Sequence, residues 1–292
     1  MLVITGSESF VGRELILQCK NKGLNVVGFD SVNATNTGYE FHQVDIRSPN
    51  ISDFIPSGAD AVIHLAALSR DADCKNRAHE CFDVNVIGTL NLIKASLRKN
   101  IKQFIFASSE WVYDEFKKDE EKDEDTYINI SNLGSEYALS KLVSEINLKQ
   151  QYKNGFCNVT ILRFGIIYGP RRDNWSAVES ILNGIKNKSE ITIGSLKTGR
   201  RFVHVSDIAR GIIMSVGLSG FNTINLTSDK VVTLQEIIDV SQRILNKSVR
   251  IIETTPSQVS VRNPSNNKAK KILHWEPKID LETGLRTILD FV

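Results

Sequence analysis

The 292-residue sequence predicts an α/β protein in which helices cover both faces of a doubly wound parallel sheet, followed by a smaller α/β lobe. Short apolar runs alternate with longer segments of helical period up to about residue 165. The pattern then changes after Gly169 and Pro170, with no Pro/Ser-rich linker between the two parts. We therefore expect a Rossmann-type domain over residues 1–169 and the smaller lobe over residues 170–292.

The elements follow from these periods. Six strands are predicted in the first domain, at residues 2–5, 25–30, 40–45, 61–66, 103–108 and 158–164. Helical patterns at residues 10–22, 79–99 and 134–152 are long enough for right-handed crossovers between parallel strands. In the lobe we expect helices near residues 175–186, 206–218 and 233–246, strands near 190–193, 222–226 and 249–253, and a helix from about residue 280.

Composition excludes several classes of function. The chain is 41% apolar and 24% charged with a net charge of +2, and it has no dense cluster of Lys and Arg, so we do not expect nucleic acid as a partner. No apolar run approaches the roughly 20 residues of a membrane span, and no signal peptide is recognisable, so we expect a cytoplasmic protein. The four cysteines lack the spacing of a disulfide framework or a zinc site, and no metal is expected.

One segment is almost entirely charged, residues 114–125, which read DEFKKDEEKDED. Such a run cannot bury apolar area, so we expect a solvated surface loop, with a role in gating a substrate as the alternative.

A nucleotide site is predicted where the first strand enters a turn from Gly6 to Gly12 that opens a helix. Such a turn directs backbone N–H groups and a helix N-terminus at a pyrophosphate, although a strand–turn–helix joint also needs glycines for steric reasons alone. The spacing is G-x-x-S-x-x-G, so Ser9 replaces the usual central glycine. Asp30 ends the second strand, where an acid would hold the adenosine ribose 2′-OH and repel a 2′-phosphate, which favours NAD over NADP; a cap or turn role is the alternative.

A possible catalytic pair lies on the helix predicted around residues 134–152. Tyr137 and Lys141 are four residues apart and so share a helix face, beside an apolar stripe of Ala138, Leu139, Leu142, Val143 and Ile146. An ammonium near a phenol favours phenolate, and together with an oxidised nicotinamide it could bring the Tyr137 pKa from about 10 toward 7. An ordinary amphipathic helix would give the same spacing.

Ser108 and Ser109 follow the fifth predicted strand, and residues beyond the carboxyl ends of such strands face the ligand crevice. We expect both hydroxyls to point there, beside Tyr137, with satisfied turn hydroxyls as the alternative.

Together these motifs resemble the extended short-chain dehydrogenase/reductase family, also called the NAD-dependent epimerase/dehydratase family. The resemblance spans essentially the whole chain. It rests on Gly6-x-x-Ser9-x-x-Gly12, Asp30, Asp45-Ile46-Arg47, His64-Leu65-Ala66-Ala67, Asn85-Val86-x-Gly88-Thr89, Ser109, Tyr137-x-x-x-Lys141, Leu162-Arg163 and Tyr168-Gly169-Pro170-Arg171. In the lobe, residues 200–207 (RRFVHVSD) are similar to the family segment RDFxxVxD, and residues 268–277 are similar to SKAxxxLGWxP.

The resemblance implies the roles of individual residues in a nucleotide-sugar enzyme with a substrate-binding C-terminal lobe. The implied catalytic residues are Ser109, Tyr137 and Lys141. The implied NAD-binding residues are Gly6, Ser9, Phe10, Val11, Gly12, Asp30, Asp45, Ile46, Leu65, Ala66, Ala67, Tyr137 and Lys141. The implied substrate-binding residues are Ser109, Glu110, Arg200 and Arg262. Family members commonly dimerise through the helices corresponding to residues 79–99 and 134–152, although the apolar side chains of these helices could instead face the sheet.

Departures from the family pattern narrow the reaction. The 4,6-dehydratases carry an acid and a base after the catalytic hydroxyl, typically Asp-Glu, whereas this chain has Glu110 and Trp111, and an indole cannot remove a proton. Ile166 stands where many relatives have an Asn that contacts the substrate, and Ser9 could crowd the pyrophosphate. We expect a sugar-nucleotide 4-epimerase that oxidises C4 transiently. The alternatives are a net 4-dehydrogenase or 4-ketoreductase, a 4,6-dehydratase, and a non-catalytic NAD-binding module.

Overall fold

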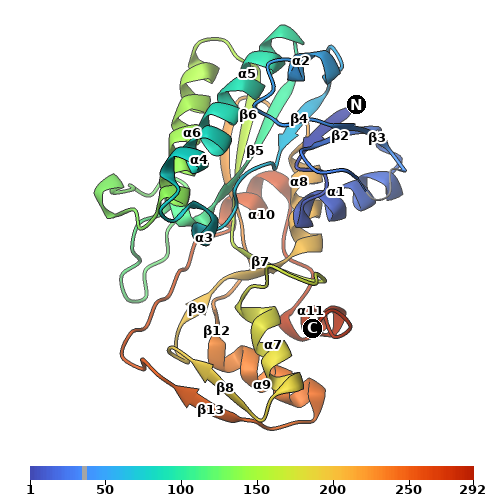
Figure 1. The fold of residues 1–292 in the computed structure, drawn as a ribbon. Coiled ribbons are helices and arrows are strands. Elements are labelled where there is room, and N and C mark those ends of the chain that lie inside the picture. Colours follow the sequence, from blue (N-terminus) through green and yellow to red (C-terminus); the bar gives the residue numbers. More distant parts are fainter. Residues whose placement is uncertain (35–37) are drawn as a thin grey trace. The chain divides into compact units, whose positions relative to one another are not determined.

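The computed structural model describes residues 1–34 and 38–292 (Figure 1). Seven strands form one sheet: β1 (Leu2–Thr5), β2 (Val26–Asp30), β3 (Glu40–Gln43), β4 (Ala61–His64), β5 (Gln103–Ser109), β6 (Asn158–Phe164) and β11 (Phe221–Leu226). Their order is β11-β6-β5-β4-β1-β2-β3. The strand order reverses between β1 and β4, which is the switch point at which a doubly wound sheet binds ligands. The predicted fold class is confirmed.

The structure does not have the single domain boundary at residue 169 that the sequence predicts, because the chain passes between two units several times. One compact unit contains Met1–Asp114, Tyr127–Arg163 and Ala209–Ile224, and the other contains Glu115–Thr126, Phe164–Ile208 and Asn225–Val292. The strand predicted in the lobe near 222–226 is β11, which adds to the edge of the large sheet beside β6. There the backbone N–H of Val159 donates to Gly220 at 2.9 Å. The segment returns to the first unit because it completes this sheet.

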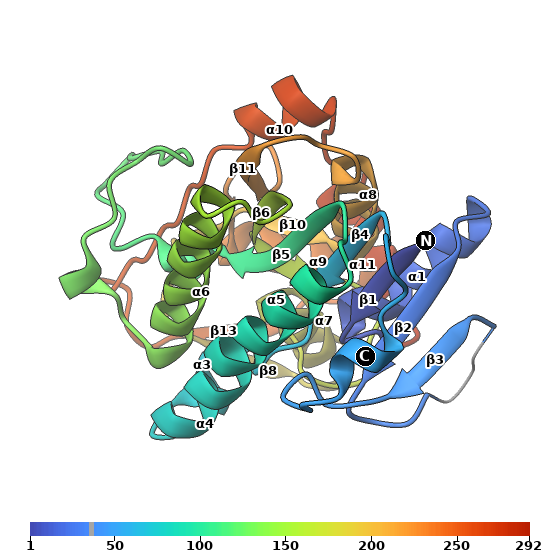
Figure 2. The same ribbon diagram turned by 90° about the horizontal axis from the view of Figure 1, so that it is seen from above.

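Helices cover both faces of the sheet, with α5 and α6 on one side and α1 on the other (Figure 2). The helices of this part are α1 (Phe10–Asn21), α2 (Ile51–Phe54), α3 (Asp71–Cys74), α4 (Ala78–Phe82), α5 (Gly88–Arg98), α6 (Glu136–Lys153) and α8 (Val205–Ser215), which crosses into the second unit. Buried side chains from both layers form its core, among them Val3, Val27, Phe29, Val62, Leu92, Ile93, Phe104, Phe106 and Leu148.

The helix predicted over residues 79–99 is three segments, α4, a π-helical turn at Asp83–Ile87, and α5. A Cβ at Gly88 would lie 2.6 Å from the Ile46 side chain, so the glycine lets α5 approach the segment after β3 closely. The change of helical period is local and leaves the overall helical pattern of the sequence intact.

The second unit contains the pairs β10–β7, β12–β9 and β13–β8. Its strands and helices are β7 (Ile166–Tyr168), α7 (Ala177–Asn187), β8 (Glu190–Ile193), β9 (Gly199–Arg200), β10 (Phe202–His204), β12 (Val232–Thr233), α9 (Leu234–Leu245), β13 (Arg250–Glu253), α10 (Asn267–Leu273) and α11 (Leu281–Thr287). Its core packs α7 against α9 and α11 through Ile181, Leu182, Ile185, Ile237, Ile238 and Leu285. Capping boxes at Ser176 and Thr233 begin α7 and α9.

The charged segment is exposed over most of its length, as expected of a solvated surface loop, but it is anchored at Glu121 and Lys122. Glu115–Thr126 belongs to the second unit. Lys122 is only 4% exposed, and Glu121 pairs with the buried Arg201 at 2.7 Å. Glu121 is held because the buried Arg201 supplies a partner.

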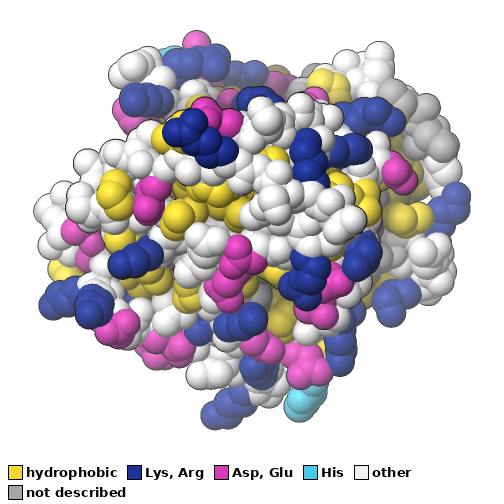
Figure 3. Space-filling view, turned by 90° about the horizontal axis from the view of Figure 1, so that it is seen from below, with side chains coloured by type: hydrophobic (Ala, Val, Ile, Leu, Met, Phe, Trp, Pro, Cys, Tyr) yellow, Lys and Arg dark blue, Asp and Glu magenta, His cyan; other side chains and the backbone are white. Residues whose placement is uncertain are grey.

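The surface carries both signs of charge. On the face drawn in Figure 3, Lys and Arg side chains lie among Asp and Glu. Within residues 1–34 and 38–292, no helix combines the length and apolar character of a membrane span.

Candidate functional site

The turn after β1 is packed so closely that it requires glycine. Gly6 has φ +70°, and a Cβ there would lie 2.7 Å from the backbone nitrogen of Ala66. A Cβ at Gly12 would lie 2.1 Å from the Gly6 carbonyl oxygen, so the first turn of α1 rests directly on the loop. The helix N-terminus is thereby held at the carboxyl end of β1, beside the half-buried residues 65–67 that follow β4. This close-packed cradle fits a dinucleotide pyrophosphate.

Ser9 is the N-cap of α1, and Phe10 and Val11 are the first helical residues. The Ser9 hydroxyl accepts a hydrogen bond from the Gly12 N–H at 3.1 Å. Serine is among the best N-cap residues, so its presence in place of the central glycine has a local structural reason.

Asp30 ends β2 and ties the glycine turn to the sheet. Its carboxylate accepts hydrogen bonds from the backbone N–H groups of Glu8 at 2.9 Å and Val32 at 3.2 Å. The turn role considered from the sequence is therefore present. A carboxylate has about four acceptor positions, so these two bonds leave capacity for ribose hydroxyls.

Asp45 and Ile46 follow β3 in different environments. Arg47 donates to Asp45 from Nε at 2.9 Å and from Nη2 at 2.7 Å, and these hydrogen bonds lower the pKa of the Asp45 carboxyl. Ile46 is 5% exposed and packs in the core. Both oxygens of the Asp45 carboxylate therefore already accept hydrogen bonds from Arg47, and a ligand at this segment would share that carboxylate with Arg47.

Three predicted catalytic residues converge inside the first unit. Ser109 is the last residue of β5, while Tyr137 and Lys141 lie in the first turns of α6. A hydrogen bond joins Ser109 to Tyr137, and the Lys141 ammonium lies 6.0 Å from the centre of the Tyr137 ring. Lys141 donates to the Ala107 carbonyl at 2.9 Å, which fixes the ammonium at the end of β5. All three side chains are buried.

The protein's own groups do not lower the pKa of Tyr137, so the lowering predicted from the sequence depends on the nicotinamide. Burial raises the pKa of Tyr137 to about 12, and the hydrogen bond from Ser109 opposes this rise only in part. Burial also lowers the pKa of Lys141 from 10.5 to about 8. Removal from water disfavours both charged forms, and at 6.0 Å from the ring the ammonium does not overcome this effect.

The shifted Lys141 pKa predicts how stability depends on pH. Between about pH 8 and pH 10.5 the folded protein has released this proton while the unfolded chain still binds it, so the free energy of unfolding rises with pH. Well below pH 8, Lys141 is protonated in both the folded and the unfolded state, and burial of its charge lowers the free energy of unfolding by the full amount. We expect wild type to gain about 3 kcal/mol relative to Lys141→Met across this window. Urea unfolding of both proteins at several pH values measures the difference, and a constant difference would contradict the shift.

Ser108 does not point to the same side as Ser109, so this part of the prediction is wrong. Successive side chains of a strand alternate between its faces. The Ser108 hydroxyl donates to Glu145 of α6 at 2.5 Å, and Glu145 also forms a buried ion pair with Arg163 of β6 at 2.7 Å. The sequence assigned Glu145 no role, although it stands four residues beyond Lys141 on the same helix.

His64 and Asn85 position the elements around the three catalytic candidates. His64 bonds with Thr5 at 2.7 Å and with Thr89 at 3.0 Å, and burial lowers its pKa to about 3, so a neutral imidazole joins β1, β4 and α5. Asn85 donates to the Leu68 carbonyl and to the Ser140 hydroxyl, both at 3.0 Å. The motifs contained both residues, but their partners are distant in sequence.

The two arginines predicted to bind substrate lie together in the second unit. The Gly199 carbonyl accepts from Arg200 Nη1 at 2.7 Å and from the backbone N–H of Arg262 at 3.1 Å. The Arg262 guanidinium lies 5.0 Å from the centre of the Phe116 ring. In the first unit, Glu110 is fully buried just after β5, whereas Trp111 is 38% exposed. The Arg200 guanidinium also donates to the Ser260 carbonyl at 2.6 Å, so both arginine side chains are held by neighbours within the second unit.

A model of one protein family, described as NAD dependent epimerase/dehydratase family, matches residues 2–223. The chain belongs to the NAD dependent epimerase/dehydratase family. Its cofactor is therefore NAD, and the chain is an NAD-dependent enzyme.

Relatives within the NAD dependent epimerase/dehydratase family carry names for more than one reaction. The chain is 26% identical to a UDP-glucuronate 4-epimerase of Thermodesulfobacterium geofontis, over 99% of this chain and 95% of that protein. It is also 26% identical to UDP-glucuronic acid decarboxylase 1 of Arabidopsis thaliana, over 99% of this chain and 69% of that protein. The structure of MoeE5 in complex with UDP-glucuronic acid and NAD shares the fold, with a TM-score of 0.88 and 23% identity over 99% of this chain and 98% of that one.

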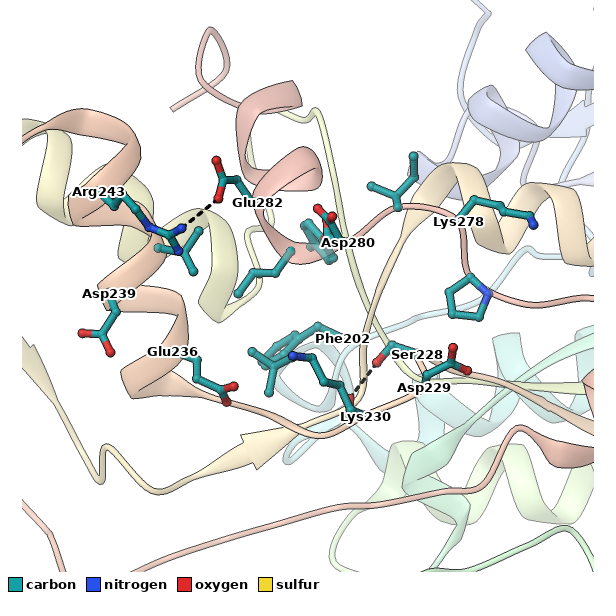
Figure 4. Close-up of a pocket in the computed structure, with 16 residues that line it drawn as sticks. Phe202, Ser228, Asp229, Lys230, Glu236, Asp239, Arg243, Lys278, Asp280 and Glu282 are labelled. Carbon is teal, nitrogen blue, oxygen red and sulfur yellow. Dashed lines mark hydrogen bonds and ion pairs between the residues drawn. The ribbon is translucent and has the colours of Figure 1, made fainter.

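A separate pocket lies within the second unit of this family member (Figure 4). It has a volume of about 570 Å³ and is lined by residues 228–230, 277–282 and part of α9. Charged groups at its edge pair with each other, as Arg243 does with Glu282 at 3.1 Å. None of the site residues predicted from the sequence lines this pocket.

Proposed function

We propose that the chain is an NAD-dependent sugar-nucleotide 4-epimerase that oxidises the sugar transiently at C4. The observation that carries this proposal is the convergence of Ser109, Tyr137 and Lys141 at the carboxyl end of β5. A relative named as a UDP-glucuronate 4-epimerase, similar over nearly the whole chain, supports it.

Each of the three residues has a separate task in this mechanism. NAD, when bound, supplies a hydride acceptor for C4 and a positive charge beside the phenol. Ser109 donates a hydrogen bond to the C4 oxygen, and Tyr137 takes the proton of the C4 hydroxyl and later returns it. Lys141, whose pKa is about 8, stays largely protonated at neutral pH and stabilises the phenolate. The 4-keto-sugar then rotates within the site, so that hydride returns to the opposite face of C4.

The nucleotide cradle holds the cofactor in this proposal. The turn from Gly6 to Gly12 and the start of α1, with Ser9, Phe10 and Val11, receive the pyrophosphate, and Asp30 receives the adenosine ribose. Residues 65–67 line the cofactor, while Asp45 and Ile46 lie near the adenine. Arg200 and Arg262 donate to the substrate diphosphate, and Glu110 lies beside the substrate.

Asp30 is expected to give a preference for NAD. A carboxylate near a 2′-phosphate repels it, so we expect NAD to bind roughly ten- to a hundredfold more tightly than NADP. Asp30→Asn should narrow the ratio chiefly by improving NADP binding. Calorimetric titration of both dinucleotides into both proteins measures this. Equal dissociation constants in the wild-type protein would refute the role of Asp30.

Epimerisation is distinguished from the neighbouring reactions by two readouts. A panel of UDP-, dTDP-, GDP- and CDP-sugars is incubated with protein and NAD, products are separated and identified by NMR, and the ultraviolet absorbance of reduced cofactor is followed. Epimer formed at constant absorbance supports the proposal. Steady change of absorbance with a 4-keto product indicates net redox, and loss of water indicates a dehydratase. The half-exposed Trp111 at the position of the dehydratase base argues against the last outcome.

We also propose a homodimer formed through the helical layer of α5 and α6. Ile87, Leu97 and Ile146 expose about half of their side chains (53%, 48% and 53%). By contrast Leu92, Ile93 and Leu142 are buried, so only part of the apolar set faces the sheet. Light scattering that finds a monomer at micromolar concentration would contradict this proposal.

A further inference from the structure

Residues Glu115–Thr126, which contain all but the first residue of the charged segment, form a strap that is joined to the segment carrying Arg262. The backbone N–H of Lys122 donates to Asn263 at 3.2 Å, and the N–H of Ser265 donates to Lys122 at 2.8 Å. The Asn263 side chain also donates to the Glu120 carbonyl at 3.4 Å. The strap therefore runs beside residues 263–265 as an added strand-like partner.

A buried arginine fastens both segments. Arg201 is 6% exposed, donates to the Asn263 side chain at 2.7 Å, and pairs with Glu121 of the strap at 2.7 Å. Arg201 stands at the position where the RDFxxVxD pattern has an acid. Because Arg201 replaces the acid of the pattern and pairs with Glu121 of the strap, this ion pair depends on a departure of the chain from the family pattern.

Phe116 of the strap contacts two buried cations. The Arg262 guanidinium lies 5.0 Å and the Lys122 ammonium 4.9 Å from the centre of its ring. Lys122 also donates to the Glu115 carbonyl at 2.6 Å, and both cations are less than a tenth exposed (Lys122 4%, Arg262 8%). A cation over an aromatic face is stabilised most when water is excluded, so the ring fixes where the guanidinium lies.

We propose that Phe116 is a positioning residue that holds Arg262 ready for the nucleoside diphosphate part of the substrate. This inference rests on the proposed function and adds the strap to the binding site. An arginine side chain loses considerable rotational freedom when it binds, and a guanidinium already fixed on a ring loses less. The phenyl ring therefore contributes to substrate affinity through Arg262, without touching the reacting atoms.

The test is calorimetric titration of UDP into the NAD-loaded protein. Phe116→Leu removes the aromatic face and is expected to weaken UDP binding roughly five- to tenfold. Phe116→Tyr keeps the ring and should bind UDP like wild type, as should Lys118→Ala, which changes an exposed position of the strap. In steady-state assays Phe116→Leu should raise KM for the nucleotide sugar by a similar factor while kcat changes little.

A double-variant cycle separates positioning from a general loss of structure. In the Arg262→Gln background, Phe116→Leu should have no further effect on UDP binding, because the ring acts through the arginine. Unchanged binding in the single variant, or an equal loss in both backgrounds, would overturn the inference and leave the proposed function standing. If the wild-type protein binds none of UDP, dTDP, GDP and CDP, the proposed function fails as well. Phe116→Met, whose flexible side chain fills space, replaces Phe116→Leu if that variant does not fold.

Discussion

Tyr137→Phe is expected to lower turnover by roughly two to four orders of magnitude, because it removes the proton acceptor at the C4 oxygen and little else. The ring of Tyr137 is 7% exposed and packs with Cys74, Cys81 and Leu68. Phenylalanine keeps this packing, so the dissociation constant of NAD should stay within about threefold. Turnover is measured with the nucleotide sugar that gives epimer in the panel assay, and NAD affinity by calorimetric titration.

The matched control is Ser109→Ala, which leaves the phenol in place and removes its hydrogen bond. We expect a smaller loss than in Tyr137→Phe, because the base is retained. Activity of Tyr137→Phe near that of wild type would contradict the assignment of the base. A large loss of NAD affinity in this variant would mean that the phenol holds the cofactor instead.

Glu145→Ala is expected to destabilise the protein by about 3–5 kcal/mol, because it leaves a buried guanidinium without its counter-ion. Both Glu145 and Arg163 have side chains that are 6% exposed, and their two hydrogen bonds measure 3.0 and 2.7 Å. Ser108 loses its partner in the same variant. The free energy of unfolding from urea titration measures the effect.

Replacing both partners gives the control. The double variant Glu145→Leu with Arg163→Met removes the buried charges together and should recover most of the lost stability. A single variant as stable as wild type would show that the ion pair is dispensable. If the double variant were no more stable than Glu145→Ala, Arg163 would stabilise the protein through other contacts, such as the Tyr113 ring 4.8 Å from its guanidinium.

Strands β1, β2, β5 and β6 could be predicted because nearly all of their residues are buried. β1 and β6 have the predicted bounds, and β2 and β5 differ from the prediction by a single residue at one end. Each of these strands is a short apolar run between turn residues, and such runs can be recognised from the sequence alone.

Long-range pairing explains what the sequence did not predict. The strand near 222–226 was recognised, but its place beside β6 depends on hydrogen bonds to residues about sixty positions earlier. The anchoring of the strap was not predicted for the same reason, since Glu121 is held by Arg201, which lies eighty positions away. The composition of a short segment does not indicate which distant residues will pair with it.

The candidate site was predicted in part. The motif spacings identified Ser109, Tyr137 and Lys141, and the structure brings these three together. The direction of the Tyr137 pKa could not be obtained from spacing, because it is set by how deeply α6 buries the phenol. Ser108 was misplaced because the exact end of β5 decides which of two neighbouring serines faces the tyrosine.

The most direct test of C4 oxidation uses UDP-glucose and UDP-glucuronate that carry deuterium at C4. The protein is incubated with each in ordinary water with NAD, and the products are analysed by NMR and mass spectrometry. The account predicts a 4-epimer that keeps the deuterium at C4, because the same hydride leaves and returns, and it predicts that Tyr137→Phe forms this epimer roughly two to four orders of magnitude more slowly. An epimer whose C4 deuterium has been replaced by solvent hydrogen, or an epimer formed equally well by Tyr137→Phe, would contradict it.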